Sequence, residues 1–410
     1  MHIMILADRI PPHHIGGAGK VAWDYARGYA QAGHRVSVIT ATPEASYTLT
    51  REGIAIYALH SRYPVRWRAW WSLYNPQVMR KLGPLLDALH PDAIHAHNIH
   101  ADLSYAALCA AHRRDIPVAW TAHDVMSFAY TKLIHHIDAT TCQVKPAQLR
   151  LPVLYNLRQM RARYNPLRNL IIQRVLRRCV QHRIAVSETL QAALQANNVG
   201  TFTVLHNGLV PGDFAPPTQA QQSQLRQALN LVGHPVVLFS GRLSALKGGP
   251  QLLAALDIVV THMPEARLLI LSATPVDGRW LQGLPHITPA HICESGWLSG
   301  DDLLAAYALA DVVVVPSVYL DPFPTVALEA MALGQPVIGS CFSGAQEAII
   351  NGQTGYILNP HDTHELARKL LGLLQDARLR QQMGEASRAR FLAHFTHSQR
   401  IEKMLQILHR

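Results

Sequence analysis

The sequence predicts an α/β protein built from two Rossmann-like, doubly wound domains, and three observations support this. The 410 residues are too many for one core, so two domains of about 200 residues each are expected. Apolar residues make up 49% of the chain, which is enough for both domains to bury a core. Short β-branched runs alternate with helical stretches along the chain, which is the order of βαβ units with parallel strands.

The first domain is expected over residues 1–214. Its predicted strands lie at 2–7, 33–40, 55–59, 92–97, 118–123, 183–187 and 202–208. A loop with three glycines follows the first strand and precedes a helix predicted over 20–32. Gly16 and Gly17 would let the backbone approach a ligand at the start of that helix, although a simple tight turn is the alternative. The loop is not a phosphate-binding P-loop, because His14 stands where that motif needs glycine.

The second domain is expected over residues 215–384, after a linker rich in proline and glutamine at 210–224. Its predicted strands lie at 236–240, 267–272, 291–296, 312–315 and 356–358. A last helix is predicted over 385–409.

Residues 310–340 are predicted to form a strand, a loop, a helix and a second strand, and this segment gives the clearest indication of a binding site. Thr325 is the expected N-cap of the helix, and the free amides near Val326 would favour a phosphate. Two carboxylates flank the helix start, Asp321 in the loop and Glu329 one turn in. A carboxylate beside a phosphate site can hold sugar hydroxyls. The segment therefore predicts a site for a nucleotide sugar, the alternative being acidic residues that are merely solvated.

This segment resembles the E-x7-E region of the retaining glycosyltransferases of family 4, which have the GT-B fold. The shared order is PS, an acid, PF, LEAMA and G-x-PV, with Asp321 where the family usually has Glu. The glycine loop, the TAHD ending at residue 124 and the G-R-x4-K of residues 241–247 extend the resemblance over nearly the whole chain. It implies two domains facing across a cleft, with residues 385–410 crossing back to the first domain.

The resemblance also implies roles for individual residues. No side chain is an obvious nucleophile, so the enzyme would act by positioning the substrates and stabilising the departing diphosphate, without a metal cofactor. The implied roles are Arg242 and Lys247 on the diphosphate, Glu329 on the ribose, Asp321 on sugar hydroxyls, Trp297 and Leu298 near the base, the amides of Thr325 and Val326 with Gly16 and Gly17 on phosphate and sugar, and His123 beside the reacting sugar. The implied reaction is hexose transfer to a glycan or lipid-linked acceptor. The rival is a non-catalytic sugar- or nucleic-acid-binding protein on the same fold.

The positive charge is concentrated in the first half of the chain. Residues 1–214 hold 23 Lys and Arg against 12 Asp and Glu, while residues 215–410 hold 14 against 15. Within residues 61–82 arginines alternate with tryptophans, which suits an anionic membrane surface, although a helix with its tryptophans packed inward is equally consistent. Residues 125–182 are helical and basic but lack a nucleic-acid recognition motif, so specific nucleic-acid binding is not expected.

The remaining signals concern metals and cellular location. His95, His97 and His100 would give an incomplete ligand set, so no metal site is expected. The five cysteines are scattered, as expected of free thiols in a reducing compartment. With no apolar run of membrane-spanning length, the expected location is the cytoplasm, with contact at the inner face of the membrane as an extension of that prediction.

Overall fold

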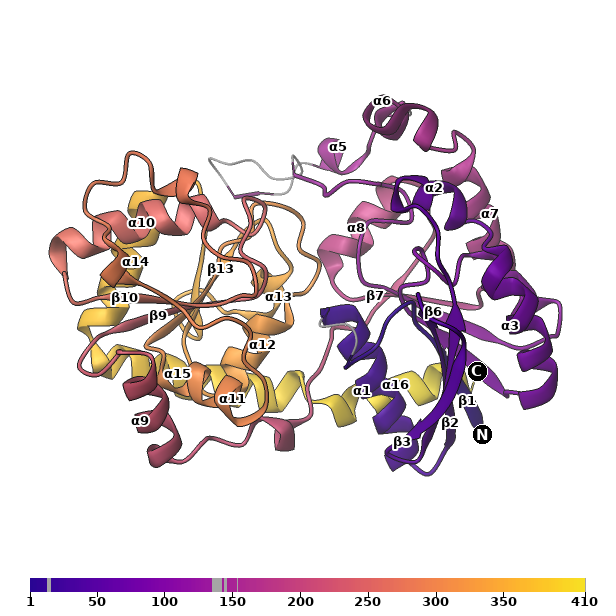
Figure 1. Ribbon diagram of the computed structural model, residues 1–410, viewed down its shortest axis with the longest axis horizontal. Helices are drawn as coiled ribbons and strands as arrows, with labels where there is room; N and C mark the ends of the chain where they lie inside the picture. The colour runs from indigo at the N-terminus through magenta and orange to yellow at the C-terminus, as the bar shows by residue number, and fades with distance from the viewer. Residues whose placement is uncertain (13–15, 135–141, 144–145, 153, 410) are drawn as a thin grey trace. The chain divides into compact units, whose positions relative to one another are not determined.

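The computed structural model describes residues 1–12, 16–134, 142–143, 146–152 and 154–409 (Figure 1). His14 of the glycine loop and parts of the basic region 125–182 therefore lie outside the described residues. The chain separates into two compact units. The first comprises Met1–Leu133, Pro146–Gly208 and His397–Arg410, and the second comprises Ile134–Lys145 and Leu209–Thr396.

The first unit is built on a sheet in which the described strands run in the order β3-β4-β2-β1-β5-β6-β7-β8. Their bounds are β1 (His2–Leu6), β2 (Arg35–Thr42), β3 (Tyr47–Arg51), β4 (Ile54–His60), β5 (Ala93–Ala96), β6 (Val118–Ala122), β7 (His182–Ala185) and β8 (Thr203–Val204). Neighbours are parallel except β3, which pairs antiparallel with β4. The central strands are buried along their whole length because helices cover both faces, and this explains their continuous apolar runs.

Helices of the first unit alternate with these strands. They are α1 (Gly17–Gln31), α2 (Arg68–Trp71), α3 (Pro76–Leu89), α4 (Ala106–His112), α5 (Pro146–Leu149), α6 (Tyr155–Met160), α7 (Arg168–Cys179), α8 (Glu188–Ala196) and α16 (His397–Leu408), with 3-10 turns η1 (Val65–Trp67) and η2 (Arg161–Arg163). Helix α16 lies along α1 (Figure 1). The two helices approach so closely at Gly28 that a Cβ there would lie 2.5 Å from His397 and Ile401.

The second unit contains a parallel sheet with the described strands in the order β11-β10-β9-β12-β13-β14. Their bounds are β9 (Val236–Ser240), β10 (Arg267–Leu271), β11 (Ile292–Glu294), β12 (Val312–Val315), β13 (Val337–Ser340) and β14 (Gly355–Leu358). The helices are α9 (Gln219–Ala228), α10 (Gly249–His262), α11 (Gly300–Leu309), α12 (Thr325–Ala332), α13 (Ala345–Ala348), α14 (Thr363–Gln375) and α15 (Ala377–His394), with 3-10 turns η3 (Pro211–Phe214), η4 (Gly278–Leu281) and η5 (Pro289–His291). The predicted α/β class with two parallel sheets is confirmed.

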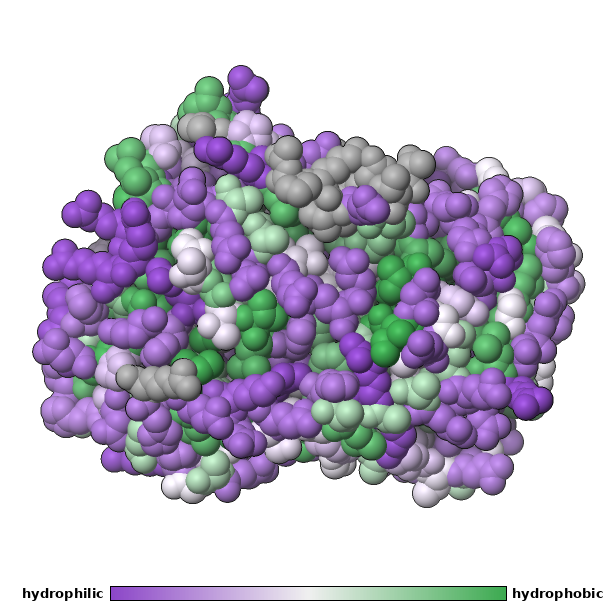
Figure 2. Space-filling model, turned by 180° about the vertical axis from the view of Figure 1, so that it is seen from behind, coloured by the Kyte–Doolittle hydropathy of each residue, from purple (hydrophilic) through white to green (hydrophobic). Residues whose placement is uncertain are grey.

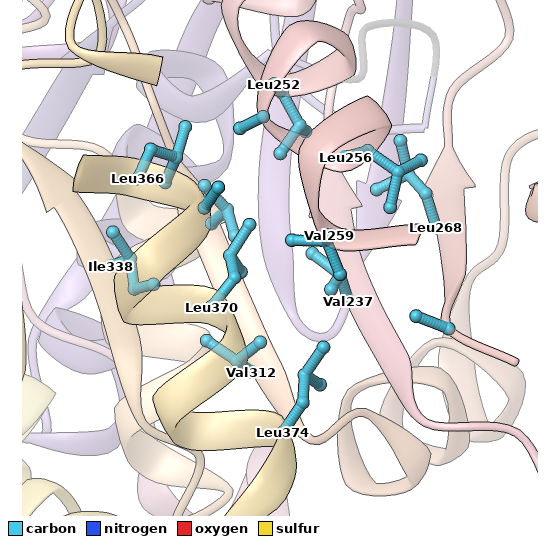
Figure 3. Close-up of a cluster of buried hydrophobic side chains, with 14 of the residues drawn as sticks. Val237, Leu252, Leu256, Val259, Leu268, Val312, Ile338, Leu366, Leu370 and Leu374 are labelled. Atoms are coloured by element: carbon cyan, nitrogen blue, oxygen red, sulfur yellow. The ribbon is translucent and has the colours of Figure 1, made fainter. Parts of the chain in front are cut away.

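A leucine-rich cluster holds one face of the second sheet (Figure 3). Leucines of α14 point toward Val312 and Ile338 of the central strands, and side chains of α10 cover Val237 beside them. Every side chain labelled in the figure is buried. This packing fixes the central strands β9, β12 and β13, and loops at their carboxyl ends carry the predicted donor-binding residues.

Candidate active site

Two loops of the second unit bring the predicted diphosphate and sugar residues together. Strands β9 and β12 are parallel neighbours, so the loops that follow them leave the same edge of the sheet. The loop after β9 carries Arg242 and Lys247, and the loop after β12 carries Asp321. The two loops are joined by a backbone hydrogen bond of 2.9 Å from the Val318 N–H to the Leu246 carbonyl.

Lys247 and Asp321 form an ion pair. The ammonium donates to Asp321 Oδ2 at 2.5 Å, and the Ser317 hydroxyl donates to the same oxygen at 3.0 Å. Burial alone would lower the pKa of Lys247, but the Asp321 carboxylate and the Tyr319 hydroxyl raise it above its ordinary value. Lys247 is therefore a fixed positive charge. The sequence analysis placed the two residues on different parts of the donor and missed their pairing.

Gly248 makes the close approach of the two loops sterically feasible. Its φ of +80° is a left-handed conformation that favours glycine. A Cβ at this position would lie 2.0 Å from the Pro316 carbonyl oxygen, so any side chain would push the loops apart. The glycine after Lys247 thus has a packing role that the sequence pattern alone does not reveal.

Helix α12 presents a second group of predicted residues. Its N-cap is Pro324, with extended backbone, so the prediction of Thr325 as N-cap was wrong by one residue. Thr325 and Val326 are the first two helical residues, and no backbone hydrogen bond within the described chain engages their N–H groups. Helix N-termini of this kind favour anions. Glu329 is buried one turn later and accepts a 2.7 Å hydrogen bond from the Tyr307 hydroxyl.

Arg242, Trp297 and Leu298 are not joined to the Lys247–Asp321 pair by any contact that the described residues show. Arg242 is exposed after β9, on the strand-end loop that also carries Lys247. Trp297 is exposed and follows β11, which β10 separates from β9 in the sheet. Their predicted roles on the diphosphate and base stay predictions.

The first unit places Gly16, Gly17 and His123 at the carboxyl edge of its own sheet. Gly16 caps α1 after β1, and His123 follows β6, two strands away in the order β1-β5-β6. His123 is 9% exposed, and its Nε2 lies 2.9 Å from Nδ1 of His97, which follows β5. Burial lowers the pKa of His123 to about 4 and holds the pKa of His97 well below its ordinary value. Both rings are neutral at pH 7.

The histidines that were considered as metal ligands contact protein groups. Nδ1 of His95 lies 2.9 Å from the Tyr29 hydroxyl, and its Nε2 lies 2.8 Å from the Thr121 hydroxyl. His100 faces the Asp124 carboxylate at 3.5 Å. Sequence reasoning missed the contact between His97 and His123, although the alternation of His95 and His97 at a strand end was the available signal.

The site can hold an anion and offer polar groups to a sugar. The second unit supplies two cations and two free amides at neighbouring strand ends, which is suited to a diphosphate. Fixed positive charge of this kind stabilises a leaving group that becomes more negative as it departs. Separately, the first unit has the neutral imidazole of His123 at the carboxyl edge of its own sheet.

Comparisons with known proteins agree with this chemistry. Residues 15–212 match the family described as Glycosyltransferase Family 4, and residues 221–390 match Glycosyl transferases group 1. Glycogen synthase of Mycobacterium tuberculosis is 26% identical over 423 residues, which cover 96% of this chain and 91% of that protein. D-inositol 3-phosphate glycosyltransferase of Corynebacterium diphtheriae is 32% identical over 205 residues, covering 47% of this chain and 46% of that protein.

Solved structures with the same fold cover both units. Sucrose-phosphate synthase of Thermosynechococcus elongatus aligns with a TM-score of 0.75 at 20% identity, over 99% of this chain and 98% of the other. HepE of Anabaena, solved with UDP and glucose, aligns with a TM-score of 0.71 at 21% identity, over 100% and 99%. The family matches span most of the chain and agree with the fold, so the protein belongs to the group 1, family 4 glycosyltransferases and has the GT-B fold.

Proposed function

We propose that this protein transfers a hexose from a nucleoside-diphosphate sugar to a glycan or lipid-linked acceptor, with retention of anomeric configuration and without a divalent metal. The observation that carries the proposal is the fixed cation of Lys247, held by Asp321 within the strand-end loops of the second unit. Arg242 precedes Lys247 on the same loop, and the amides of α12 add a partial positive charge. The resemblance of residues 310–340 to retaining enzymes supports retention.

The proposed mechanism relies on stabilising charge as the bond to the diphosphate breaks. Oxygens of the diphosphate compete with Asp321 for Lys247, so the ammonium meets the developing negative charge without a large rearrangement. Asp321 then contacts sugar hydroxyls, and His123 contacts the sugar as it flattens toward an oxocarbenium-like state. The acceptor attacks the same face from which the diphosphate departs. No step needs a protein nucleophile.

The first experiment tests donor, metal and stereochemistry together. UDP-, GDP- and ADP-sugars are incubated with candidate acceptors, with and without excess EDTA, and the product's anomeric configuration is read by NMR. We expect turnover with one nucleotide class, unchanged by EDTA, and a product with the donor's configuration. Loss of turnover that magnesium or manganese restores would contradict metal independence, and an inverted product would contradict retention. Nucleotide binding without turnover would favour the non-catalytic alternative.

Membrane contact of the first unit belongs to the same proposal. Val65 is 76% exposed, and Trp67 and Trp70 are exposed beside it, whereas Trp71 stacks on Tyr63. Figure 2 shows hydrophobic and hydrophilic residues side by side on the first unit, at the left of that view. Among the described residues, no helix combines the length and hydropathy of a membrane span. Exposed aromatic side chains among arginines suit the surface of an anionic bilayer.

Sedimentation with vesicles tests this contact. We expect the protein to pellet with anionic vesicles at low salt, to be released at high salt and to stay in solution with neutral vesicles. The double variant Trp67→Ala, Trp70→Ala should pellet less. The matched control Leu392→Ala removes an exposed apolar side chain from the second unit and should behave as the wild type. Equal pelleting with neutral and anionic vesicles would contradict the electrostatic component.

A further inference from the structure

A fully buried guanidinium in the first unit has no acidic partner among the residues that the structure describes. Arg168 begins α7 and is 0% exposed. Its Nε donates to the Ser72 hydroxyl at 3.0 Å, but neither Nη1 nor Nη2 forms a hydrogen bond within the described part of the chain. The Tyr164 hydroxyl is electrostatically coupled to Arg168, but its hydrogen bonds go to other residues: it donates to Asn169 at 2.6 Å and accepts from Asn156 at 3.2 Å. Burying a charge without an acidic partner is costly, so such a group points to a role that the fold alone does not explain.

Other buried polar atoms of the first unit also lack partners within the described structure, and Ser127 precedes Phe128, whose carbonyl accepts from Asn169, the residue after Arg168. Hydrogen-bond partners are also missing, among the described residues, for Nε of Arg68 and for the buried hydroxyls of Tyr105, Ser127 and Tyr130. The Arg168 guanidinium lies 5.4 Å from the centre of the Tyr130 ring. All four of these atoms can donate a hydrogen bond, which is the property an anion requires.

Electrostatic coupling shows that the two arginines share one neighbourhood. Burial lowers the pKa of His100 and raises the pKa of Tyr105 and Tyr130, and the charges of both Arg68 and Arg168 act on all three groups in addition. The charges of Arg68 and Arg168, which are far apart in the sequence, thus act on the same three side chains.

The nearby carboxylates do not neutralise these arginines. Asp124 lies 3.5 Å from the neutral ring of His100 and accepts from Asn98 at 3.3 Å. Asp8 accepts backbone N–H groups of residues 101–103 at 2.7 to 2.8 Å. Neither acid lies within 4.0 Å of a guanidinium nitrogen of Arg68 or Arg168 in the described structure. Among the described residues, neither Arg68 nor Arg168 therefore has an acidic partner.

We propose that Arg68, Tyr105, Ser127, Tyr130 and Arg168 form a binding site for a phosphate group, hereafter the phosphate site, and that on the proposed function this phosphate belongs to the acceptor. Two guanidinium groups and three hydroxyls match the several oxygens of a phosphate better than the two oxygens of a carboxylate. Arg68 and Tyr130 are only half-buried, so they form the side from which a ligand enters.

The position of the phosphate site within the first unit supports assignment to the acceptor. The charges of both arginines act on His100, which follows β5 and lies 3.5 Å from Asp124 after β6; the ends of these two strands also carry His97 and His123. A molecule that holds its phosphate here would extend toward His123 along the same edge of the sheet. The nucleotide diphosphate, in contrast, is assigned to the second unit.

Calorimetry with inorganic phosphate tests the site in the full-length protein. We expect saturable binding to the wild type, measured against sodium chloride at equal ionic strength. Tyr105→Phe removes one buried hydroxyl that has no partner, so its Tm without phosphate should equal or exceed that of the wild type, and its phosphate affinity should fall about tenfold. Arg168→Met should abolish binding. The matched control Arg174→Met removes an exposed arginine from the same helix and should bind phosphate as the wild type does.

The outcomes separate the phosphate site from nonspecific attraction and from failed folding. Equal phosphate binding in the wild type, Tyr105→Phe and Arg168→Met would overturn the site, as would no binding to the wild type. If Arg168→Met does not fold, Ser127→Ala joins Tyr105→Phe as the second test. UDP and GDP binding, measured in parallel, should be unchanged in Tyr105→Phe. Lost phosphate binding with normal nucleotide binding overturns neither the family nor the donor site.

Two further ligands distinguish the source of the phosphate. A soluble phosphorylated polyol, such as an inositol phosphate, is compared with vesicles that contain phosphatidic acid. Competition with inorganic phosphate by only one of them assigns the acceptor to that class, and the competition should disappear in Tyr105→Phe. Competition by neither ligand at concentrations where inorganic phosphate binds would overturn the acceptor assignment and leave an adventitious ion only.

Discussion

His97 and His123 share one proton between their facing nitrogens, and the surroundings of His97 decide which ring donates it. Nε2 of His97 is buried and has no hydrogen-bond partner among the described residues. If His97 accepts from His123, this Nε2 must carry a buried, unsatisfied N–H; if His97 donates, Nε2 is only an unused lone pair. Orphaned N–H groups are the rarer and costlier of the two. His97 therefore donates, and the proton of His123 sits on Nδ1.

Exchanging the donor at position 97 for an acceptor should change catalysis. His97→Asn keeps an N–H near the Nδ1 position and should retain transfer within a few-fold. His97→Asp offers only acceptor oxygens and should move the His123 proton from Nδ1 to Nε2. Nδ1 of His123 can then no longer donate a hydrogen bond, so kcat should fall at least about tenfold. Long-range nitrogen–proton NMR of the His123 ring reads the tautomer directly. A wild-type ring protonated on Nε2 would show that His97 does not set the tautomer.

The ion pair of Lys247 and Asp321 predicts opposite effects for the two partners. Lys247→Met should weaken nucleoside-diphosphate binding by roughly 1.5–3 kcal/mol, the value of a charged hydrogen bond, or about 10- to 150-fold. Asp321→Asn frees the ammonium, so binding should be equal or tighter while the transfer rate falls. Calorimetry and product formation measure the two effects separately. Equally weakened binding in both variants would mean that Asp321 acts only by holding Lys247 in place.

The pairs His97–His123 and Lys247–Asp321 are features of the site that the sequence did not predict. The amides of α12, the glycine before α1 and the cations after β9 are local features, so motifs indicated each of them. The partner of Lys247 lies 74 residues away and the partner of His123 lies 26 residues away. Such contacts depend on strand order, which hydrophobic periodicity does not specify.

Helix α12 offers a test at the level of the element, because its first residue can lose its N–H without losing the helix. Proline is well tolerated at the first helical position. Thr325→Pro should therefore keep the fold and lower donor affinity about tenfold if this N–H binds the phosphate. Thr325→Ala removes only the hydroxyl and should bind the donor like the wild type. Calorimetry with the nucleotide sugar decides, and equal affinity in all three proteins would remove this amide from the site.

Strand β3 and the last helix departed from the prediction because each depends on pairing with another segment, and α9 begins at Gln219, inside the predicted linker 210–224. Strand β3 was not predicted because its sequence, YTLTR, is largely exposed and has no apolar run; it exists as an antiparallel edge paired to β4. The single helix predicted over 385–409 is instead α15 and α16. The helix is interrupted at Phe395 and Thr396, where the backbone pairs with Leu209. Long-range backbone pairing decided both cases, whereas the buried parallel strands were evident from their composition.

At the scale of the whole molecule, the described histidines whose pKa is depressed all belong to the first unit. Burial lowers the pKa of His95 to about 3 and the pKa of His100 and His123 to about 4. An unfolded chain would bind protons at these rings near pH 6.5. Asp8 has the opposite sign, because burial and then Asp102 raise its pKa to about 7.

Acid should therefore unfold the first unit before the second. The three histidines contribute full stability above pH 6.5, where both states are neutral, and lose it as the pH falls toward 4, because only the unfolded state then takes up protons. Each is worth about 1.4 kcal/mol per pH unit in that window, and the single opposing change at Asp8 offsets about one of them. Hydrogen exchange followed by mass spectrometry at pH 7, 6 and 5, corrected for intrinsic rates, should show protection lost from β1, β5 and β6 while β9 and β12 stay protected. Earlier loss from β9 and β12, or simultaneous loss from both sheets, would show that groups outside this histidine cluster control acid stability.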